Sequence, residues 1–218
     1  MNVIVYVEGA SDKKAMEVLL DNLIEEKREQ GIAIHFVEAP PGDKKQVMLS
    51  KIPIKAANIL LNNPDAIVIA MPDLYPKNKC FKHETVAEMS AGIKGNFTEA
   101  LRAKGQRGRE YLYLDRFKVF CFKHDLEALI LASLDALRRY LNDIQISEDW
   151  IVPVEDQDHD NPPKRIVEAL FRQHDRKYHD VLDAPSILRL SSARDIANKC
   201  PQCFGPFLDF LENLSRSF

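Results

Sequence analysis

The chain has 218 residues and a formal net charge of -3, and 45% of its residues are hydrophobic. That length is enough for one sizeable core or for a domain with an extension, but it leaves little room for two independent domains. The mild negative charge gives no global reason to expect a nucleic acid or a membrane as partner, so any such contact would need a local basic patch.

Neither an export signal nor a membrane span is expected. The first apolar run is too short for a signal peptide, and no stretch approaches the ~20 apolar residues that cross a bilayer. The four cysteines do not suggest a disulfide framework, which fits a reducing compartment. We therefore expect a soluble, cytoplasmic protein with no membrane partner.

The first predicted element is a strand over residues 3–7, an apolar run that stops at Glu8. Such a run, followed at once by a helical pattern, is typical of a buried parallel strand that leads into a tight turn. Ser11 or Asp12 can cap the helix that follows, and its apolar periodicity continues to Gln30. Because ligands bind at the carboxyl ends of strands in open α/β sheets, Glu8 is well placed for function.

A second buried strand over 66–71 also leads to an acid, Asp73. Between the two strands we expect a short strand over 32–37, a loop over 40–43, an ambiguous segment over 44–52 for which a helix is favoured, and a helix over 53–63. Buried strands separated by helices indicate right-handed βαβ units and a parallel sheet. Glu8 and Asp73 should therefore face the same crevice.

The pattern then predicts a helix over 83–103, a strand over 117–122 and a helix from about Asp125. His124 and Glu127 are three residues apart and can approach each other in the first turn of that helix, whereas Asp125 should point elsewhere. Further on we expect an acidic loop over 151–163 and helices over 164–172, 192–198 and 206–214. The predicted fold is a Rossmannoid parallel sheet flanked by helices over 1–145, with a helical C-terminal extension over 146–218 packed on it.

Three strand ends thus deliver Glu8, Asp73 and the group His124, Asp125 and Glu127 to one edge of the sheet. Convergent carboxylates repel one another unless a cation is bound, and such oxygen-rich sites suit Mg²⁺ or Mn²⁺ in phosphoryl chemistry. The alternative is that these acids cap helices and are solvated, and His124 could simply donate a hydrogen bond to Glu127.

The segment Val5-Tyr6-Val7-Glu8-Gly9-Ala10-Ser11-Asp12 resembles the first motif of Toprim domains, the module of topoisomerases, primases and overcoming-lysogenization-defect (OLD) nucleases. The resemblance implies that Glu8 is the general acid or base. It also implies an Asp-x-Asp metal motif after a later strand, where this chain keeps Asp73 but has Tyr75 in the second position. A phenol binds Mg²⁺ poorly, so either Glu127 or Asp125 completes the site or the domain only binds.

Four short motifs in the right order resemble one Toprim-like family, DUF4276. They are Asp73-Leu74-Tyr75, His124-Asp125-Leu126-Glu127-Ala128, Pro163-Lys164-Arg165 and Lys199-Cys200-Pro201. The resemblance implies a role in bacterial or phage defence beside an ATPase partner. Two functions follow as hypotheses: a Mg²⁺-dependent nuclease or related phosphodiesterase, or a non-catalytic module that binds a partner ATPase or a nucleotide.

Two further patterns each allow two interpretations. A basic run with interleaved tyrosines could follow a nucleic acid backbone, or it could be a solvated loop; its cations are Arg102, Lys104, Arg107, Arg109 and Arg116. A second set has the spacing of zinc ligands and comprises Cys80, His83, Cys200 and Cys203. For this set we favour unrelated thiols over a structural zinc site, because nothing in the sequence brings the two pairs together.

Overall fold

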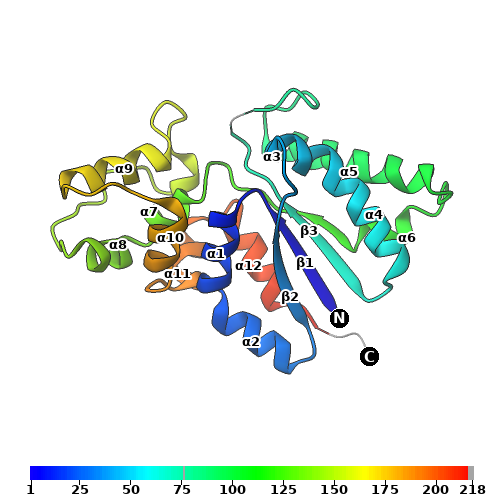
Figure 1. Cartoon of the computed structure of the whole chain (residues 1–218), viewed down its shortest axis with the longest axis horizontal. Helices are drawn as coiled ribbons and strands as arrows, with labels where there is room; N and C mark the ends of the chain where they lie inside the picture. Colours follow the sequence, from blue (N-terminus) through cyan, green and yellow to red (C-terminus); the bar gives the residue numbers. More distant parts are fainter. Residues whose placement is uncertain (76, 216–218) are drawn as a thin grey trace. The chain divides into compact units, whose positions relative to one another are not determined.

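The computed structural model describes residues 1–75 and 77–215, which form two compact units (Figure 1). The first, called here the sheet unit, comprises Met1–Gly9 and Asn22–Cys121 together with Leu214 and Ser215. The second, called here the helical unit, comprises Ala10–Asp21 and Phe122–Asn213. The predicted domain limit after residue 145 lies inside the helical unit and stays a prediction.

Within the described residues, the strands of the sheet unit form one four-stranded parallel sheet in the order β2-β1-β3-β4. The strands are β1 (Asn2–Val7), β2 (Ala33–Glu38), β3 (Ala66–Met71) and β4 (Phe117–Val119). In the register of the central pair, Val7 lies opposite Met71. The predicted α/β fold with a parallel sheet flanked by helices is confirmed.

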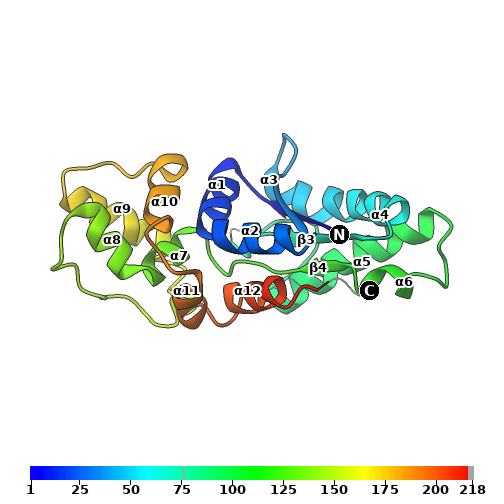
Figure 2. The same ribbon diagram turned by 90° about the horizontal axis from the view of Figure 1, so that it is seen from below.

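Helices cover one face of this sheet, and α4 and α5 run side by side along it (Figure 2). The helical segments of the sheet unit are α2 (Asp21–Glu29), α3 (Lys44–Gln46), the π-helical η1 (Val47–Lys51), α4 (Ile52–Asn62), α5 (Val86–Ala103) and α6 (Tyr111–Leu114). Tyr6, Val68 and Ala70 point into the core beneath η1, α4 and α5, where the rings of Phe97 and Phe117 stack at 4.4 Å. The opposite face is also buried, since Val5 and Ile69 are inaccessible to solvent.

The start of α5 is set by a capping box. The Thr85 hydroxyl accepts a hydrogen bond from the Glu88 backbone N–H at 3.2 Å, and the Glu88 carboxylate accepts one from the Thr85 N–H at 3.1 Å. These two bonds satisfy donors that a helix N-terminus otherwise leaves open. The helix expected from residue 83 therefore begins at Val86.

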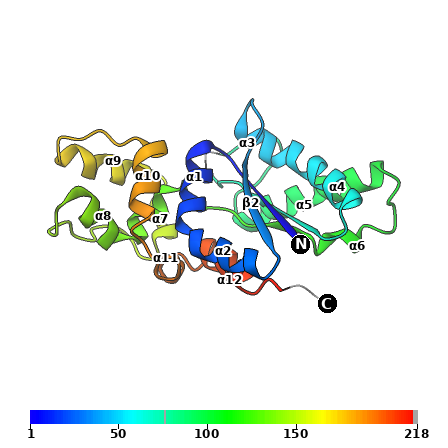
Figure 3. The same ribbon diagram turned by 60° about the horizontal axis from the view of Figure 1, so that its bottom comes forward.

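The helical unit contains α7 (Glu127–Ala132) with α8, α9 and α10 gathered around it (Figure 3). The other segments are α1 (Ala10–Leu19), α8 (Leu134–Leu141), the 3-10 turn η2 (Val154–Asp156), α9 (Pro163–Gln173), α10 (Asp180–Leu188), α11 (Ala193–Lys199) and α12 (Phe204–Glu212). The three predicted C-terminal helices correspond to α9, α11 and α12. None of the helices in the described residues is both long enough and apolar enough to cross a membrane.

Three sequence predictions differ from the structure. The helix expected as far as Gln30 is broken after Leu19, and Asp21 starts a new helix because an acid is favourable in a first turn. Strand β4 is short: the Phe120 N–H still donates to Ala70 O at 3.0 Å, and the chain then leaves the sheet. Helix α10 was not predicted, because it contains Pro185 and a proline usually ends a helix rather than lying inside it.

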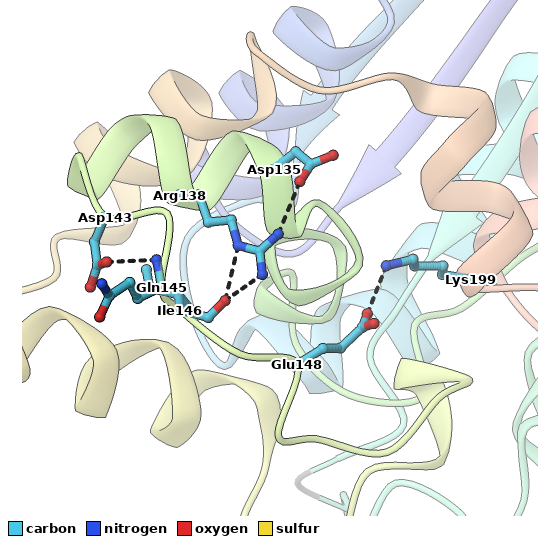
Figure 4. A network of polar contacts seen from close by, with 7 residues as sticks. All are labelled: Asp135, Arg138, Asp143, Gln145, Ile146, Glu148 and Lys199. Atoms are coloured by element: carbon cyan, nitrogen blue, oxygen red, sulfur yellow. Dashed lines mark hydrogen bonds and ion pairs between the residues drawn. The ribbon is translucent and has the colours of Figure 1, made fainter.

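The loop that follows α8 is irregular but held at several points (Figure 4). The Arg138 guanidinium donates two hydrogen bonds to Ile146 O, at 2.9 and 2.7 Å, and Asp143 accepts one from the Gln145 N–H. Farther along, Lys199 and Glu148 form an ion pair at 2.7 Å. This loop is therefore ordered by charged side chains rather than by regular secondary structure.

Candidate functional site

The candidate site lies at the carboxyl ends of β1 and β3. The chain passes from β1 to β2 on one side and reaches β3 on the other, so the direction of strand order reverses between β1 and β3. Such a switch point opens a crevice, because the connections from the two strands leave in opposite directions. Glu8 follows β1 and Asp73 follows β3, so these residues flank the switch point as predicted.

A direct hydrogen bond joins the two strand ends. The Glu8 carboxylate oxygen Oε1 accepts the backbone N–H of Asp73 at 2.9 Å. The Glu8 side chain is 17% exposed, so its carboxylate is held in place and still reached by solvent. The structure thus brings together the two residues of the sheet unit that sequence reasoning selected for this edge.

Sequence reasoning missed a third participant, Lys45 of α3. Its Nζ lies 3.1 Å from Glu8 Oε1, and it donates hydrogen bonds to the backbone carbonyls of Asp73 and Tyr75. The Lys45 side chain is 8% exposed, which is unusual for a lysine unless it is paired. The sequence does contain a signal for Lys45. This residue shares helical spacing with Met48, Leu49 and Ile52, which are buried, and the apolar face of a helix seldom includes a lysine.

Tyr75 takes the position at which the Toprim pattern has a second aspartate. Its side chain is partly buried against the core of the sheet unit, and the Lys77 ammonium lies 5.9 Å from its ring centroid. These contacts give the ring a packing role. The site therefore gains no carboxylate at this position.

The other predicted site residues, His124, Asp125 and Glu127, belong to the helical unit. Glu127 is 2% exposed, and burial raises its pKa. Burial and the charge of Glu127 raise the pKa of Asp125 to about 7. Within the described part of the chain, Asp125 Oδ1, Glu127 Oε1 and the Tyr178 hydroxyl are buried without a hydrogen-bond partner.

One cation accompanies this acidic pair. Lys164 Nζ lies 3.8 Å from Glu127 Oε1 and 3.6 Å from Asp180 Oδ2. Burial lowers the pKa of Lys164, but Glu127 and Asp180 raise it by more. A single ammonium cannot neutralise all of these carboxylates, so Asp125 and Glu127 compete for one proton. The pair can therefore bind or release that proton near neutral pH.

His124 is also buried, and this burial lowers its pKa, while a hydrogen bond with the Gln157 backbone opposes the shift. The imidazole is therefore mostly neutral at pH 7 and can accept a proton. Its predicted roles as proton donor or as partner of Glu127 stay predictions.

The Cys-x-x-Cys segment, residues 200–203, immediately precedes α12. Buried Glu155 accepts backbone N–H groups of Gln202, Cys203 and Phe204, at 2.6, 2.8 and 3.2 Å, and so caps that helix. Burial raises the pKa of Cys200, which keeps its thiol protonated.

The other two residues considered as zinc ligands are Cys80, which is exposed, and His83, whose Nδ1 lies 2.9 Å from Phe81 O. Across residues 1–75 and 77–215, no group of three or more His, Cys, Asp or Glu side chains could hold a metal ion. Cys80 and His83 belong to the sheet unit and Cys200 and Cys203 to the helical unit, and the four-ligand zinc site stays the less favoured hypothesis.

The predicted nucleic-acid-binding cations have two different environments in the structure: one is held in ion pairs, and the others are exposed in a loop. Arg102 is engaged by Glu99 at 2.7 Å and by Glu110 at 2.6 Å. Lys104, Arg107 and Arg109 are exposed in the loop after α5. This loop precedes the start of β4, so it lies at the amino edge of the sheet, opposite Glu8. Nucleic acid contact by these residues stays a prediction.

Comparison with known proteins gives a family and a set of similar structures. The family described as "Domain of unknown function (DUF4276)" matches residues 7–212, which confirms the assignment made from the four short motifs. No curated protein matches the chain.

Two solved structures are similar to it. One is the C-terminal region of the Burkholderia pseudomallei OLD protein, at 13% identity and a TM-score of 0.44, covering 96% of this chain and 98% of that one. The other is the C-terminal region of the Xanthomonas campestris pv. campestris OLD protein, at 12% identity and a TM-score of 0.44, covering 96% and 95%.

Proposed function

The chain belongs to the DUF4276 family, and we propose that it cleaves or otherwise processes phosphodiester bonds, as a nuclease of the Toprim kind that uses Mg²⁺ or Mn²⁺. The observation that carries this proposal is the fixed carboxylate of Glu8 at the switch point, bonded across the crevice to the Asp73 N–H. A switch point is where an α/β sheet binds ligands, and the Glu8 side chain stays partly open to solvent there.

Glu8 has the features of a proton-transfer group. Its Oε1 is oriented by an N–H and an ammonium, and its side chain remains partly open to solvent. In phosphodiester hydrolysis a water oxygen bonds to phosphorus as the P–O bond to the leaving oxygen breaks. Glu8 would take the proton that this water loses, a step that contributes about 10²- to 10⁴-fold in other enzymes.

Asp73 is the residue of the sheet unit best suited to hold a metal ion. Mg²⁺ is often bound through one or two carboxylates plus substrate phosphates and water, so half-buried Asp73 fits this mode without a preformed cage. A bound divalent ion would neutralise phosphate charge. The contribution of Asp125 or Glu127 as a further ligand, and of His124 as a catalytic group, remains part of the proposal.

The experiment is a calorimetric titration with Mg²⁺ and Mn²⁺, followed by cleavage assays on single- and double-stranded DNA and RNA. Asp73→Asn should weaken metal binding at least tenfold. Asp65→Asn is the matched control, because Asp65 is exposed and precedes the same strand at its other end. Glu8→Gln should lower the cleavage rate about 10²-fold or more. Cleavage by Glu8→Gln at the wild-type rate would show that the assigned role is wrong.

A non-catalytic module that binds a partner ATPase or a nucleotide is the second candidate. It is favoured by Tyr75 in place of a carboxylate and by Lys45, which already neutralises Glu8. This function predicts no cleavage by the wild-type chain in any metal. It also predicts either a stable complex with an ATPase encoded beside it or nucleotide binding by calorimetry. Cleavage that depends on Glu8 would exclude it.

A further inference from the structure

Lys45 makes a charged contact inside the crevice, with its Nζ 3.1 Å from Glu8 Oε1. An ammonium has three N–H donors, and here three oxygens surround it: Glu8 Oε1, Asp73 O and Tyr75 O. A lysine that reaches out to a substrate would keep a donor free. Lys45 is instead a fixed internal cation, held between the ends of β1 and β3.

We propose that Lys45 is a positioning residue that acts as the resident cation of the crevice, so that Glu8 is kept from binding metal and a divalent ion binds through Asp73 without Glu8. This inference rests on the proposed function and refines it. It gives a physical reason for the division of tasks proposed above, in which Glu8 transfers the proton and Asp73 holds the ion.

The first step of the argument is electrostatic. The positive charge of Lys45 lies 3.1 Å from Glu8 Oε1, and both side chains are largely buried. A divalent ion on the same carboxylate would sit a few ångströms from the ammonium and be repelled, with little solvent to screen the two charges. The carboxylate is therefore neutralised by the protein before any metal arrives.

The second step concerns the loop after β3. The Lys45 ammonium binds the backbone carbonyl of Tyr75, the residue that stands where the Toprim pattern has its second metal-binding carboxylate. This chain thus has a phenol at this point, and the Lys45 ammonium supplies positive charge to the crevice.

The test is calorimetric titration with Mn²⁺ of the full-length chain and its Lys45→Met variant. Met has a similar length but no charge, so Glu8 becomes available as a ligand. We expect the Mn²⁺ affinity to rise at least tenfold, and the gain to disappear in the Lys45→Met/Glu8→Gln double variant. Lys44→Met is the matched control, because the neighbouring Lys44 ammonium binds Ala39 O at 2.7 Å and should leave the affinity unchanged.

Circular dichroism shows whether the variants fold. If Lys45→Met does not, Lys45→Gln carries the measurement, because its amide can still donate to the two carbonyls. Unchanged or weaker Mn²⁺ binding in the folded variant would overturn the inference, as would a gain that survives in the double variant. A wild-type chain that binds Mn²⁺ but cleaves no nucleic acid, combined with a Glu8-dependent gain in the variant, would refute the proposed nuclease and leave the assignment of Lys45 standing.

Discussion

The buried acidic pair of the helical unit makes the stability of the protein depend on pH, and Asp125→Asn should remove much of that dependence. Asp125 has an ordinary pKa of 3.8, and burial with the charge of Glu127 raises it to about 7 in the folded protein. Asparagine has nearly the same shape but carries no charge at any pH. The substitution therefore isolates the cost of ionising this group inside the unit.

The sign follows from proton binding. Between pH 4 and 7 the folded protein holds a proton on Asp125 that the unfolded chain has lost, so this contribution is complete below the unfolded pKa and is lost as pH rises through the folded pKa. The slope is at most about 1.4 kcal/mol per pH unit. From pH 5 to pH 7 the unfolding free energy of wild type should therefore fall by at most about 3 kcal/mol. The nearby Lys164 ammonium stabilises the ionised form of Asp125 and so reduces this loss.

The assay is urea denaturation followed by circular dichroism at pH 5, 6, 7 and 8 and constant ionic strength. The difference in unfolding free energy between Asp125→Asn and wild type should grow in favour of the variant from pH 5 to pH 7 and then level off by pH 8, because only wild type loses the Asp125 proton. Asp135→Asn, at a side chain that is 85% exposed in the same unit, is the control for a general charge effect. A difference between wild type and Asp125→Asn that is constant across this pH range would refute the reasoning.

Two further predictions concern charged groups that hold the fold together. Glu155→Gln replaces a carboxylate oxygen, at the N-terminus of α12, by an NH₂ group that faces backbone donors, and should lower the unfolding free energy by about 2–3 kcal/mol in urea. A change below about 0.5 kcal/mol would mean that the capping bonds do not matter. Arg116 donates to the carbonyls of Leu60, Asn63 and Pro64 at 3.0–3.2 Å, so Arg116→Ala should cost about 1–2 kcal/mol. Thermal melts should show only partial recovery in Arg116→Lys, because one ammonium cannot span these acceptors; full recovery would argue against the proposed geometry.

Local pattern was sufficient to predict the central strands and the acids that follow them. The apolar run before Glu8 and the run before Asp73 become β1 and β3, because such runs can be buried on both faces only in the middle of a parallel sheet. Four short motifs were sufficient to identify the family. These features depend on residues that are close together in the chain, and so periodicity and motif order reveal them.

The tertiary structure decided which side chains meet. Lys45 binds Glu8 from 37 positions away, Asp73 donates its N–H to Glu8 from 65 away, and Glu155 caps a helix almost 50 residues downstream. It also decided that Arg102 pairs with Glu110 across a loop. Periodicity describes which face of an element is buried, but it carries no information on which distant charge lies opposite. Burial of a charge depends on that partner, and so the sequence can place Lys45 on an apolar helix face, but only the fold shows that it pairs with Glu8.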